Sequence, residues 1–409
     1  MTFFKTNYKL IIIMAILVSI GKSTDMESYS AGSAACCQAL EQIKSGEPDI
    51  VFCFASSRFN HSQLIQGIKS IIPNAPLVGC TTAGEITADG PETKSVIVLL
   101  LQSDKLHTAV GMGGKVSIAA RSAGSKLARD VIQKTNDSFI RHALMIFSDG
   151  INGNGTDVIR GIQDITGTSF PIIGGSAGDD FLFQNTFQYY EAGVFQDSVV
   201  GVLFSGDIKI GIGARHGWYP LGKPQIVTDA RHNIIKKLDG RPAAGIYEEY
   251  FGPRVAEMHK EPLVRMAIMY PLGMSIQGEA ECIIRNVLRA NEFGELVCAG
   301  EVPVSSEIRV MMGSKEAALK AARKAAQIAL AGLKGLKAKV VFVFDSVSRK
   351  KLYGRNAAQE IEILKDVFGL AVPIFGFYTY GEQAPLGAEI NLGQAFFHNE
   401  TIVVFAIGE

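Results

Sequence analysis

Short apolar runs alternate with amphipathic segments along most of the chain, and the same order of segments occurs three times. Each apolar run is typical of a buried strand: "DIVFCFAS" from Asp49, "ALMIFSDG" from Ala143 and "VVFVFDS" from Val340. After a polar break, apolar residues recur every three or four positions, which predicts a helix. The three helical segments are "HSQLIQGIKSII" from His61, "GTDVIRGIQDIT" from Gly155 and "NAAQEIEILKDVFG" from Asn356.

A second pattern follows each predicted helix and consists of proline, two apolar residues, glycine, several mostly small residues and an acid. We call the three occurrences signature turns: "PLVGCTTAGE" from Pro76, "PIIGGSAGDD" from Pro171 and "PIFGFYTYGE" from Pro373. The apolar start of each predicts a strand, and the glycine-rich end leaves that strand. One more apolar strand then follows: "SVIVLLL" from Ser95, "SVVGVLF" from Ser198 and "TIVVFAI" from Thr401.

Each repeat also opens with a strand, a glycine and an alanine-rich helix. The opening strands are "AILVSIG" from Ala15, "HTAVGMGG" from His107 and "EIRVMMG" from Glu307. The sequence therefore predicts an α/β fold of three β-α-β-α-β-β modules of about 95 residues, with covered, largely parallel or mixed sheets. The material before the third module reads as a central α+β insert.

These patterns set the domain boundaries that we expect. Residues 1–13 form a ragged N-terminal extension, residues 14–206 hold two modules, residues 207–304 the insert and residues 305–409 the third module. The apolar run "LIIIMAILVSI" from Leu10 has the length of a signal-peptide core, and it is too short to span a bilayer. We interpret it as the first strand, because its counterparts in the other two modules cannot be signal peptides.

Composition excludes several classes of protein. Lys plus Arg equals Asp plus Glu at 40 each, so no net field recruits nucleic acid or an anionic membrane. The six cysteines contain no C-x-x-C pair, which favours a reducing, cytoplasmic location. The seven histidines lack metal-ligand spacing, and we expect neither a metal nor a cofactor.

The ends of the signature turns are the candidate binding site. Ligands of open α/β sheets bind beyond the carboxyl ends of the strands, where glycines let a ligand approach the backbone. Hydroxyl groups and acids can then hold an ammonium or a hydroxyl group. The expected ligand-binding residues are Gly79, Cys80, Thr81, Thr82, Gly84, Glu85, Ser176, Gly178, Asp179, Asp180, Arg355, Thr379, Gly381 and Glu382.

A structural interpretation of the signature turns stands beside this one. Thr82 and Thr379 occupy equivalent positions, as do Glu85 and Glu382. One fold repeated three times needs the same turn three times, and its acid can simply accept bonds from backbone N–H groups.

Two enzyme interpretations also follow from the signature turns. Ser176 lies in "GGSAG", which satisfies G-x-S-x-G, but the strand-like segment after it does not suit a nucleophile elbow. The thiol of Cys80 lies among N–H dipoles that could lower its pKa. Its counterparts, Gly175 and Phe377, carry no thiol, so we expect no catalytic residue shared by the modules.

Two further stretches carry candidate chemistry. "GARHGWYPLG" holds His216 and the single tryptophan, Trp218, and we interpret it as a surface turn anchored by a buried indole. In "SVSRKKLYGR", the run from Arg349 to Lys351 reads as a solvated charge run. Arg355, just before a helix, is the better candidate to bind a carboxylate.

Four motifs in order resemble the FIST (F-box and intracellular signal transduction) sensory family. They are "PLVGCTTAGEI", "GGSAGDDFLFQNTFQYY", "LDGRPAAGIYEEYFG" and "GFYTYGEQAP" with "FHNETIVVFAI". The resemblance implies FIST N-terminal and C-terminal domains that bind small molecules such as amino acids in signal transduction. The chain departs from the family pattern at Ser346 and Gln383.

The leading hypothesis is therefore a stand-alone sensor whose signature turns bind a small polar metabolite, possibly an amino acid. Its output would act in trans on a signalling partner protein. The alternatives are a hydrolase that uses Ser176, a thiol-dependent activity at Cys80, and a protein-interaction scaffold.

Overall fold

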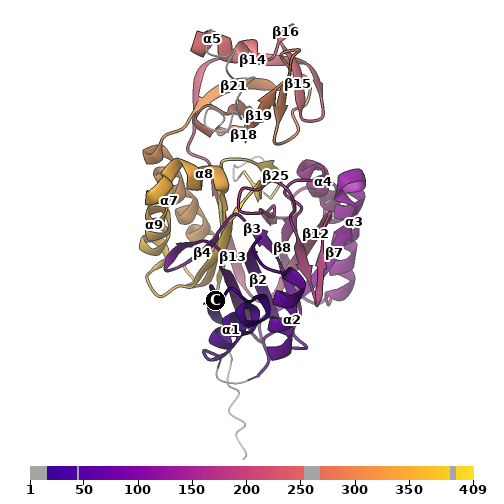
Figure 1. The fold of residues 1–409 in the computed structure, drawn as a ribbon, viewed down its shortest axis with the longest axis vertical. Coiled ribbons are helices and arrows are strands. Elements are labelled where there is room, and N and C mark those ends of the chain that lie inside the picture. Colours follow the sequence, from indigo (N-terminus) through magenta and orange to yellow (C-terminus); the bar gives the residue numbers. More distant parts are fainter. Residues whose placement is uncertain (1–15, 44–45, 253–267, 387–392) are drawn as a thin grey trace, which may run out of the picture.

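The computed structural model describes residues 16–43, 46–252, 268–386 and 393–409 (Figure 1). Module one comprises β1 (Leu17–Ser23), α1 (Ser28–Leu40), β2 (Ile50–Ser56), α2 (His61–Ile71), β3 (Leu77–Thr82), β4 (Glu85–Thr87), β5 (Gly90–Glu92) and β6 (Val96–Gln102). Module two comprises β7 (Leu106–Gly114), α3 (Val116–Lys134), β8 (Arg141–Ser148), α4 (Gly155–Thr166), β9 (Ile172–Gly175), β10 (Gln188–Tyr190), β11 (Gly193–Phe195) and β12 (Ser198–Gly206).

Module three repeats this order with one long interruption. It comprises β13 (Lys209–Arg215), α7 (Lys315–Gly332), β22 (Ala338–Ser346), α8 (Val347–Tyr353), η2 (Gly354–Asn356), α9 (Ala358–Phe368), β23 (Ile374–Thr379), β24 (Glu382–Pro385), β25 (Ala395–His398) and β26 (Ile402–Gly408). The interruption is the insert, with β14 (Tyr219–Arg231), β15 (Ile234–Leu238), β16 (Arg241–Pro242), α5 (Gly245–Phe251), β17 (Leu272–Met274), β18 (Ile283–Arg285), β19 (Val287–Ala290), β20 (Leu296–Cys298) and β21 (Glu307–Met312).

The four long strands of each module lie side by side in one sheet, but not in chain order. The last strand of the module lies between the first and the second, and the third lies on the other side of the second. In module one the order is β1-β6-β2-β3, in which β2 and β3 are parallel and the other pairs antiparallel. Modules two and three repeat this order as β7-β12-β8-β9 and β13-β26-β22-β23. The predicted α/β class with repeated modules is confirmed, and the sheets are mixed.

The short hairpin of each module completes the sheet of another module. The hairpin β4-β5 of module one pairs with β23 of module three, and β24-β25 of module three pairs with β9 of module two. The hairpin β10-β11 of module two pairs with β3 of module one, which closes the cycle. The modules therefore depend on each other for one edge of every sheet.

Phenylalanine side chains from the three sheets form the centre of the molecule. Phe52 of β2 lies 5.1 Å from Phe342 of β22, and Phe54 lies 5.1 Å from Phe147 of β8, both between ring centroids. All four rings are fully buried. Helices α1 and α2, α3 and α4, and α7 and α9 cover the outer faces of the three sheets (Figure 1).

Polar residues at the predicted breaks start the covering helices. The side chains of Asn60, Asn154 and Ser314 each accept a hydrogen bond from a backbone N–H in the first turn of α2, α4 and α7. Such N-cap bonds satisfy donors that have no partner within the helix. These three helices therefore begin where the sequence pattern placed them.

The first glycine of each signature turn is required by a close approach between parallel strands. A Cβ atom added at Gly79, Gly174 or Gly376 would lie only 1.8, 2.0 or 1.9 Å from a carbonyl oxygen of the neighbouring strand. No side chain fits such a distance. The recurrence of this glycine in the sequence is thus explained by packing.

The third module differs from the prediction in the origin of its first strand. The predicted strand "EIRVMMG" is β21, which pairs with β14 and β17 in the insert sheet. The strand that pairs with β26 is instead β13, which comes before the insert. The prediction was wrong because both strands are short and apolar, and only tertiary pairing distinguishes them. The insert thus interrupts module three between its first strand and first helix.

The described part of the N-terminal apolar run is a strand, as predicted. β1 pairs antiparallel with β6 along an edge of the sheet and is only partly buried, and residues 10–15 lie outside the described residues.

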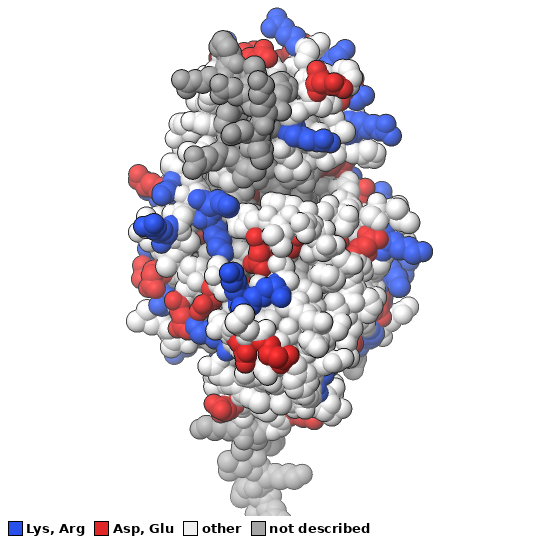
Figure 2. Space-filling view, in the orientation of Figure 1, with Lys and Arg blue, Asp and Glu red and all other residues white. Residues whose placement is uncertain are grey.

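No helix in the described ranges is long and apolar enough to cross a membrane. Figure 2 shows Lys and Arg interspersed with Asp and Glu over one face of the molecule.

The guanidinium group of Arg349 fastens the base of the insert to module three. This side chain is fully buried and donates to the backbone oxygens of His216, where the insert begins, and Ala318 in α7. It also pairs with the carboxylates of Glu360 and of Asp345, the latter at 2.9 Å between Nε and Oδ1. The interpretation of Arg349 as part of a solvated charge run was therefore wrong.

We expect Arg349→Ala to lower the free energy of unfolding by about 3–5 kcal/mol, because it leaves buried carboxylates without their cation. Arg355→Ala is the matched control, since Arg355 is exposed, and we expect it to change stability by less than about 0.5 kcal/mol. Urea denaturation followed by circular dichroism measures both. Equal effects of the two substitutions would contradict this role of Arg349.

A buried acid occupies the turn before the last strand of module three. Lys94, Asp197 and Glu400 hold equivalent left-handed positions, with φ of 55°, 50° and 56°, but Glu400 alone of the three is fully buried. The Asn286 amide and the Ser348 hydroxyl lie near its carboxyl group without a well-aligned hydrogen bond. Burial outweighs their effect and raises the pKa of Glu400 to about 8.

A carboxyl group with a raised pKa binds more protons in the folded than in the unfolded chain, so stability falls as pH rises toward that pKa. We expect Glu400 to remove about 2 kcal/mol of stability between pH 6.5 and 8, and Glu400→Gln to abolish this part of the fall. Burial lowers the pKa values of His61, His216 and His398 to about 4, 3 and 4. These groups therefore change the stability of the fold below pH 6.5, outside this range.

Urea denaturation at several pH values measures this difference. The exposed Glu292→Gln serves as the control and keeps the wild-type pH dependence. A Glu400→Gln profile parallel to that of the wild type would show that Glu400 does not carry a raised pKa.

Candidate functional site

The three signature turns meet and hydrogen-bond to one another at one end of the module sheets. Their backbones are joined by Gly178 N to Thr81 O at 3.0 Å, Ala83 N to Tyr378 O at 3.0 Å and Ser176 N to Gly381 O at 2.7 Å. Convergence of the turns therefore does occur. The turns satisfy each other's backbone groups, however, and the open space lies to one side of them.

The acids of signature turns one and three act as scaffolding. Glu85 is fully buried and accepts hydrogen bonds from the hydroxyl groups of Thr82 and Ser95. Glu382 likewise accepts from the Thr379 hydroxyl, and from the Thr401 N–H at 3.1 Å. Burial raises the pKa of Glu85 to about 7 and that of Glu382 well above its ordinary value.

In signature turn two, the hairpin strand begins eight residues later in the chain than in the other two turns. Glu85 pairs across the strands with Phe377 and Glu382 with Gly175, whereas the equivalent partner of Cys80 is Gln188. Gln188, not Asp180, therefore holds the structural position of the acid. The extra residues form a loop between β9 and β10.

Two acids hold this extra loop in place. Asp179 is buried and accepts from the N–H groups of Phe183, Gln184 and Asn185, and from the Tyr380 hydroxyl. The Oδ2 atom of Asp180 accepts from Ser56 and Ser57 of module one. Both carboxylates are thus occupied by the protein itself.

The remaining candidates in signature turn one, and Gly178 of signature turn two, are buried inside the protein. Burial raises the pKa of Cys80 well above its ordinary value, which argues against the alternative in which backbone dipoles activate this thiol. The Thr81 hydroxyl accepts from the Phe187 N–H at 3.0 Å. A Cβ at Gly84 would lie 2.2 Å from Lys350 Nζ, and one at Gly178 would lie 2.7 Å from Ala83 N, so both glycines are sites of close contact.

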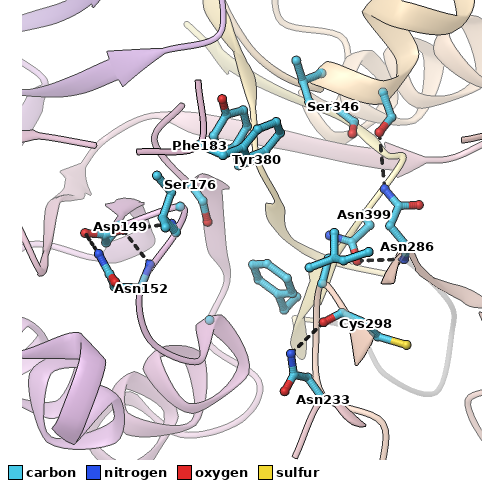
Figure 3. A pocket seen from close by; sticks show the side chains of 18 of the residues that line it. Asp149, Asn152, Ser176, Phe183, Asn233, Asn286, Cys298, Ser346, Tyr380 and Asn399 are labelled. Carbon is cyan, nitrogen blue, oxygen red and sulfur yellow. Dashed lines mark hydrogen bonds between the residues drawn. The ribbon is translucent and has the colours of Figure 1, made fainter. Parts of the chain in front are cut away.

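A cavity of about 320 Å³ lies between module two, module three and the insert (Figure 3). Its volume is at the lower end of the range of about 300–1,000 Å³ occupied by small-molecule sites. Module two contributes the turn between β8 and α4, with Asp149 and Asn152, together with Ser176, Phe181 and Phe183. Module three contributes Ser346, Val347, Ser348, Tyr380, Phe397 and Asn399, and the insert contributes Asn233, Ile268, Asn286, Val287, Leu288, Cys298 and Ala299.

The turn after β8 is built around the carboxylate of Asp149. Its Oδ1 accepts from the N–H groups of Ile151 and Asn152, both at 2.9 Å. Its Oδ2 accepts from the Asn152 amide at 3.3 Å and from the Asp197 N–H at 3.1 Å. The carboxylate therefore shapes the cavity wall, because four donors already occupy its oxygens.

Aromatic rings form the second part of the wall. Phe183 stacks on Tyr380 with 4.6 Å between ring centroids and an interplanar angle of 16° (Figure 3). The Phe397 ring fits among three glycines, at which an added Cβ would lie 2.5, 3.1 and 2.3 Å from the ring: Gly155, Gly300 and Gly381. Gly381, expected to admit a ligand, thus admits a ring that lines the cavity.

Ser176 is the one predicted residue that lines the cavity. Its hydroxyl lies 2.9 Å from the Ser148 hydroxyl and accepts from the Gln383 amide at 2.9 Å. Neither neighbour is a base, so these contacts do not activate Ser176 as a nucleophile. No group of three or more His, Cys, Asp or Glu in the described ranges could hold a metal ion.

The charged and aromatic candidates of the other two stretches do not line the cavity, although the stretch that contains Arg355 begins with the lining residues Ser346, Val347 and Ser348. Arg355 is exposed on η2 and is not among the lining residues. The Trp218 indole is buried, as predicted, but His216 is buried as well, which a surface turn would not produce. The Trp218 indole donates to the Ile268 backbone oxygen at 2.9 Å, inside the insert junction.

Most cavity residues were missed because they come from segments far apart in the chain. One local signal was available: "SDGINGNG", rich in glycine and asparagine, follows the strand β8 directly. Turns at strand ends are where α/β proteins bind ligands. The insert residues carry no comparable signal.

Sequence comparisons give relatives of this chain that are themselves uncharacterized. A segment of 213 residues is 32% identical to an uncharacterized protein of Methanocaldococcus jannaschii and covers 49% of this chain but only 39% of that relative. An uncharacterized protein of Mycobacterium tuberculosis is 23% identical over 381 residues, which are 90% of this chain and 95% of the relative.

Solved structures are more distant. A cyanuric acid hydrolase of A. caulinodans gives a TM-score of 0.37 at 9% identity, over 96% of this chain and 99% of the other. PurLQS from Thermotoga maritima gives 0.22 at 11% identity, over 96% of this chain and 72% of the other. Scores of this size support no conclusion about this chain.

Family models cover most of the chain. The FIST N domain matches residues 49–241, and the FIST C domain matches residues 243–385, with their border inside the insert. The resemblance seen in the sequence is thereby confirmed. The chain belongs to the FIST family, whose domains are sensory domains of signal transduction.

Proposed function

We propose that this protein senses a small polar molecule, which binds in the cavity between modules two and three and the insert. The observation that carries the proposal is the composition of the cavity wall. Three separate parts of the chain place amide, hydroxyl and aromatic groups around one space of ligand size. Amino acids are one candidate class, because the FIST resemblance implies them.

A ligand in this cavity would hold the insert against the modules. The insert is joined to module three by two neighbouring antiparallel strands, with Tyr219 opposite Met312 and Leu221 opposite Val310. A ligand that contacts the insert and the modules together binds best when they are close. It would therefore shift the population toward that arrangement in proportion to its difference in affinity.

The output of such a sensor would be read by a signalling partner protein. The partner would distinguish the two arrangements of the insert, as expected for a sensor that acts in trans. We place this function in the cytoplasm, because the described cysteines are free thiols and most of them are buried.

We expect a thermal-shift panel of amino acids and related polar metabolites to contain at least one stabilising ligand. At 100 times its Kd, the ligand should add about 2.7 kcal/mol to the free energy of unfolding. Ala299→Phe places a ring in the cavity and should abolish the shift, whereas Ala331→Phe on the exposed face of α7 should retain it.

Two results would contradict the proposal. The first is a broad panel in which no compound changes the melting temperature of the wild type. The second is a stabilising ligand whose effect is the same in Ala299→Phe as in Ala331→Phe, because its site would then lie elsewhere.

A further inference from the structure

The charged groups of the cavity wall decide the charge of its ligand. Among the described residues that line the cavity, Asp149 is the single carboxylic acid and no Lys, Arg or His is present. A carboxylate has about four positions at which it can accept hydrogen bonds. The backbone N–H groups of Ile151, Asn152 and Asp197 and the Asn152 amide occupy those of Asp149.

This arrangement disfavours a charged or zwitterionic ligand. Among the described residues of this wall, an ammonium group would find no free carboxylate and a carboxylate would find no cationic side chain. Burial of an unpaired charge is far more costly than burial of a neutral polar group. An amino acid would bring both charges at once, so the cavity is poorly matched to it.

Neutral amide groups are the polar feature that the cavity does provide. Asn286 Nδ2 donates to the Ser348 hydroxyl at 3.3 Å, but its Oδ1 is buried and lacks a hydrogen-bond partner within the described ranges. Buried polar atoms without a partner are rare in proteins. Asn286 lies in the cavity wall, and a turn of its amide group about the Cβ–Cγ bond would present this oxygen to a donor on the ligand, such as an amide N–H.

Two further amides lie near Asn286 in Figure 3, Asn399 beside it and Asn233 next to Cys298. Asn399 Oδ1 accepts from the backbone N–H of Asn286 at 3.4 Å. Asn233 on the insert donates to the Cys298 backbone oxygen at 2.8 Å, while its own side-chain oxygen is an additional acceptor. Side-chain amides present both donors and acceptors, which complement the N–H and C=O groups of another amide.

Aromatic groups at the mouth of the cavity indicate a ligand with a flat apolar part. Phe183 is 57% exposed although it stacks on Tyr380, and Leu288 on the facing insert strand is 53% exposed. Exposed apolar side chains that rim a polar cavity mark a surface that something else covers. Aromatic side chains stack favourably on flat rings.

We infer that the cavity binds an uncharged ring compound that carries a carboxamide or cyclic amide group, with the amide against Asn286 and the ring against Phe183 and Tyr380. This inference rests on the proposed function, since it names the ligand class of the same cavity. It excludes free amino acids as the preferred ligands.

Benzamide, benzoate and benzamidinium test the charge preference, because they have nearly the same shape and carry charges of zero, minus one and plus one. Ligand-observed NMR titration of the full chain measures their relative affinities, and uracil and phenylalanine extend the panel to a cyclic amide and an amino acid. We expect the neutral compounds to bind more than about ten-fold more tightly than the charged ones. Ala299→Phe should remove this binding.

Asn286→Asp tests the position of the amide without relying on loss of binding. The new carboxylate should raise the affinity for benzamidinium above that for benzamide, which a purely structural role of Asn286 would not produce. Asn286→Leu should weaken benzamide binding and leave benzamidinium weak.

The outcomes separate this inference from the proposed function. Tighter binding of phenylalanine, benzoate or benzamidinium to the wild type, lost in Ala299→Phe, would overturn the inference and leave the cavity as the sensory site. Binding of neutral compounds that Ala299→Phe does not affect would overturn both. Failure of every probe and of the metabolite panel would also overturn both.

Discussion

The exchange of hairpins among the three modules is the constraint on which the rest of this structure depends. Every module sheet gains its final two strands from another module, so no sheet is complete alone. The exchange brings the signature turns together, and their backbones satisfy one another. It also faces the three sheets inward around a common phenylalanine core, as the contact of Phe52 with Phe342 shows.

This constraint explains why the most repetitive residues are not the ones around the cavity. Glu85 and Glu382 hold their turns through Thr82 and Thr379, and the fold needs that bond in each copy that carries the acid. Space for a ligand arises where the repetition breaks, at the extra loop of module two and at the insert. Chemistry that differs among the modules is therefore the better guide to the site.

Much of the fold could be predicted from the sequence, because strand and helix periodicity and the repeated glycines are local signals. Tertiary facts could not be predicted: β13 and β21 look alike as sequence, and only pairing with β26 identifies the first strand of module three. The positions of the charged side chains could not be predicted for the same reason. Arg349, predicted to be solvated, is buried by α7 and the insert, while Arg355, predicted to bind a ligand, is exposed. Ser176 was predicted from its motif and lines the cavity, whereas Asn286 lines it from the insert without any motif.

The central claim is that the cavity beside the signature turns holds the molecule that this protein senses. Native mass spectrometry of the full chain, purified without denaturation, tests this most directly when wild type and Ala299→Phe are compared. The account predicts a small-molecule adduct on the wild type that is missing from the variant. The same adduct on both proteins, or none on either, would contradict it.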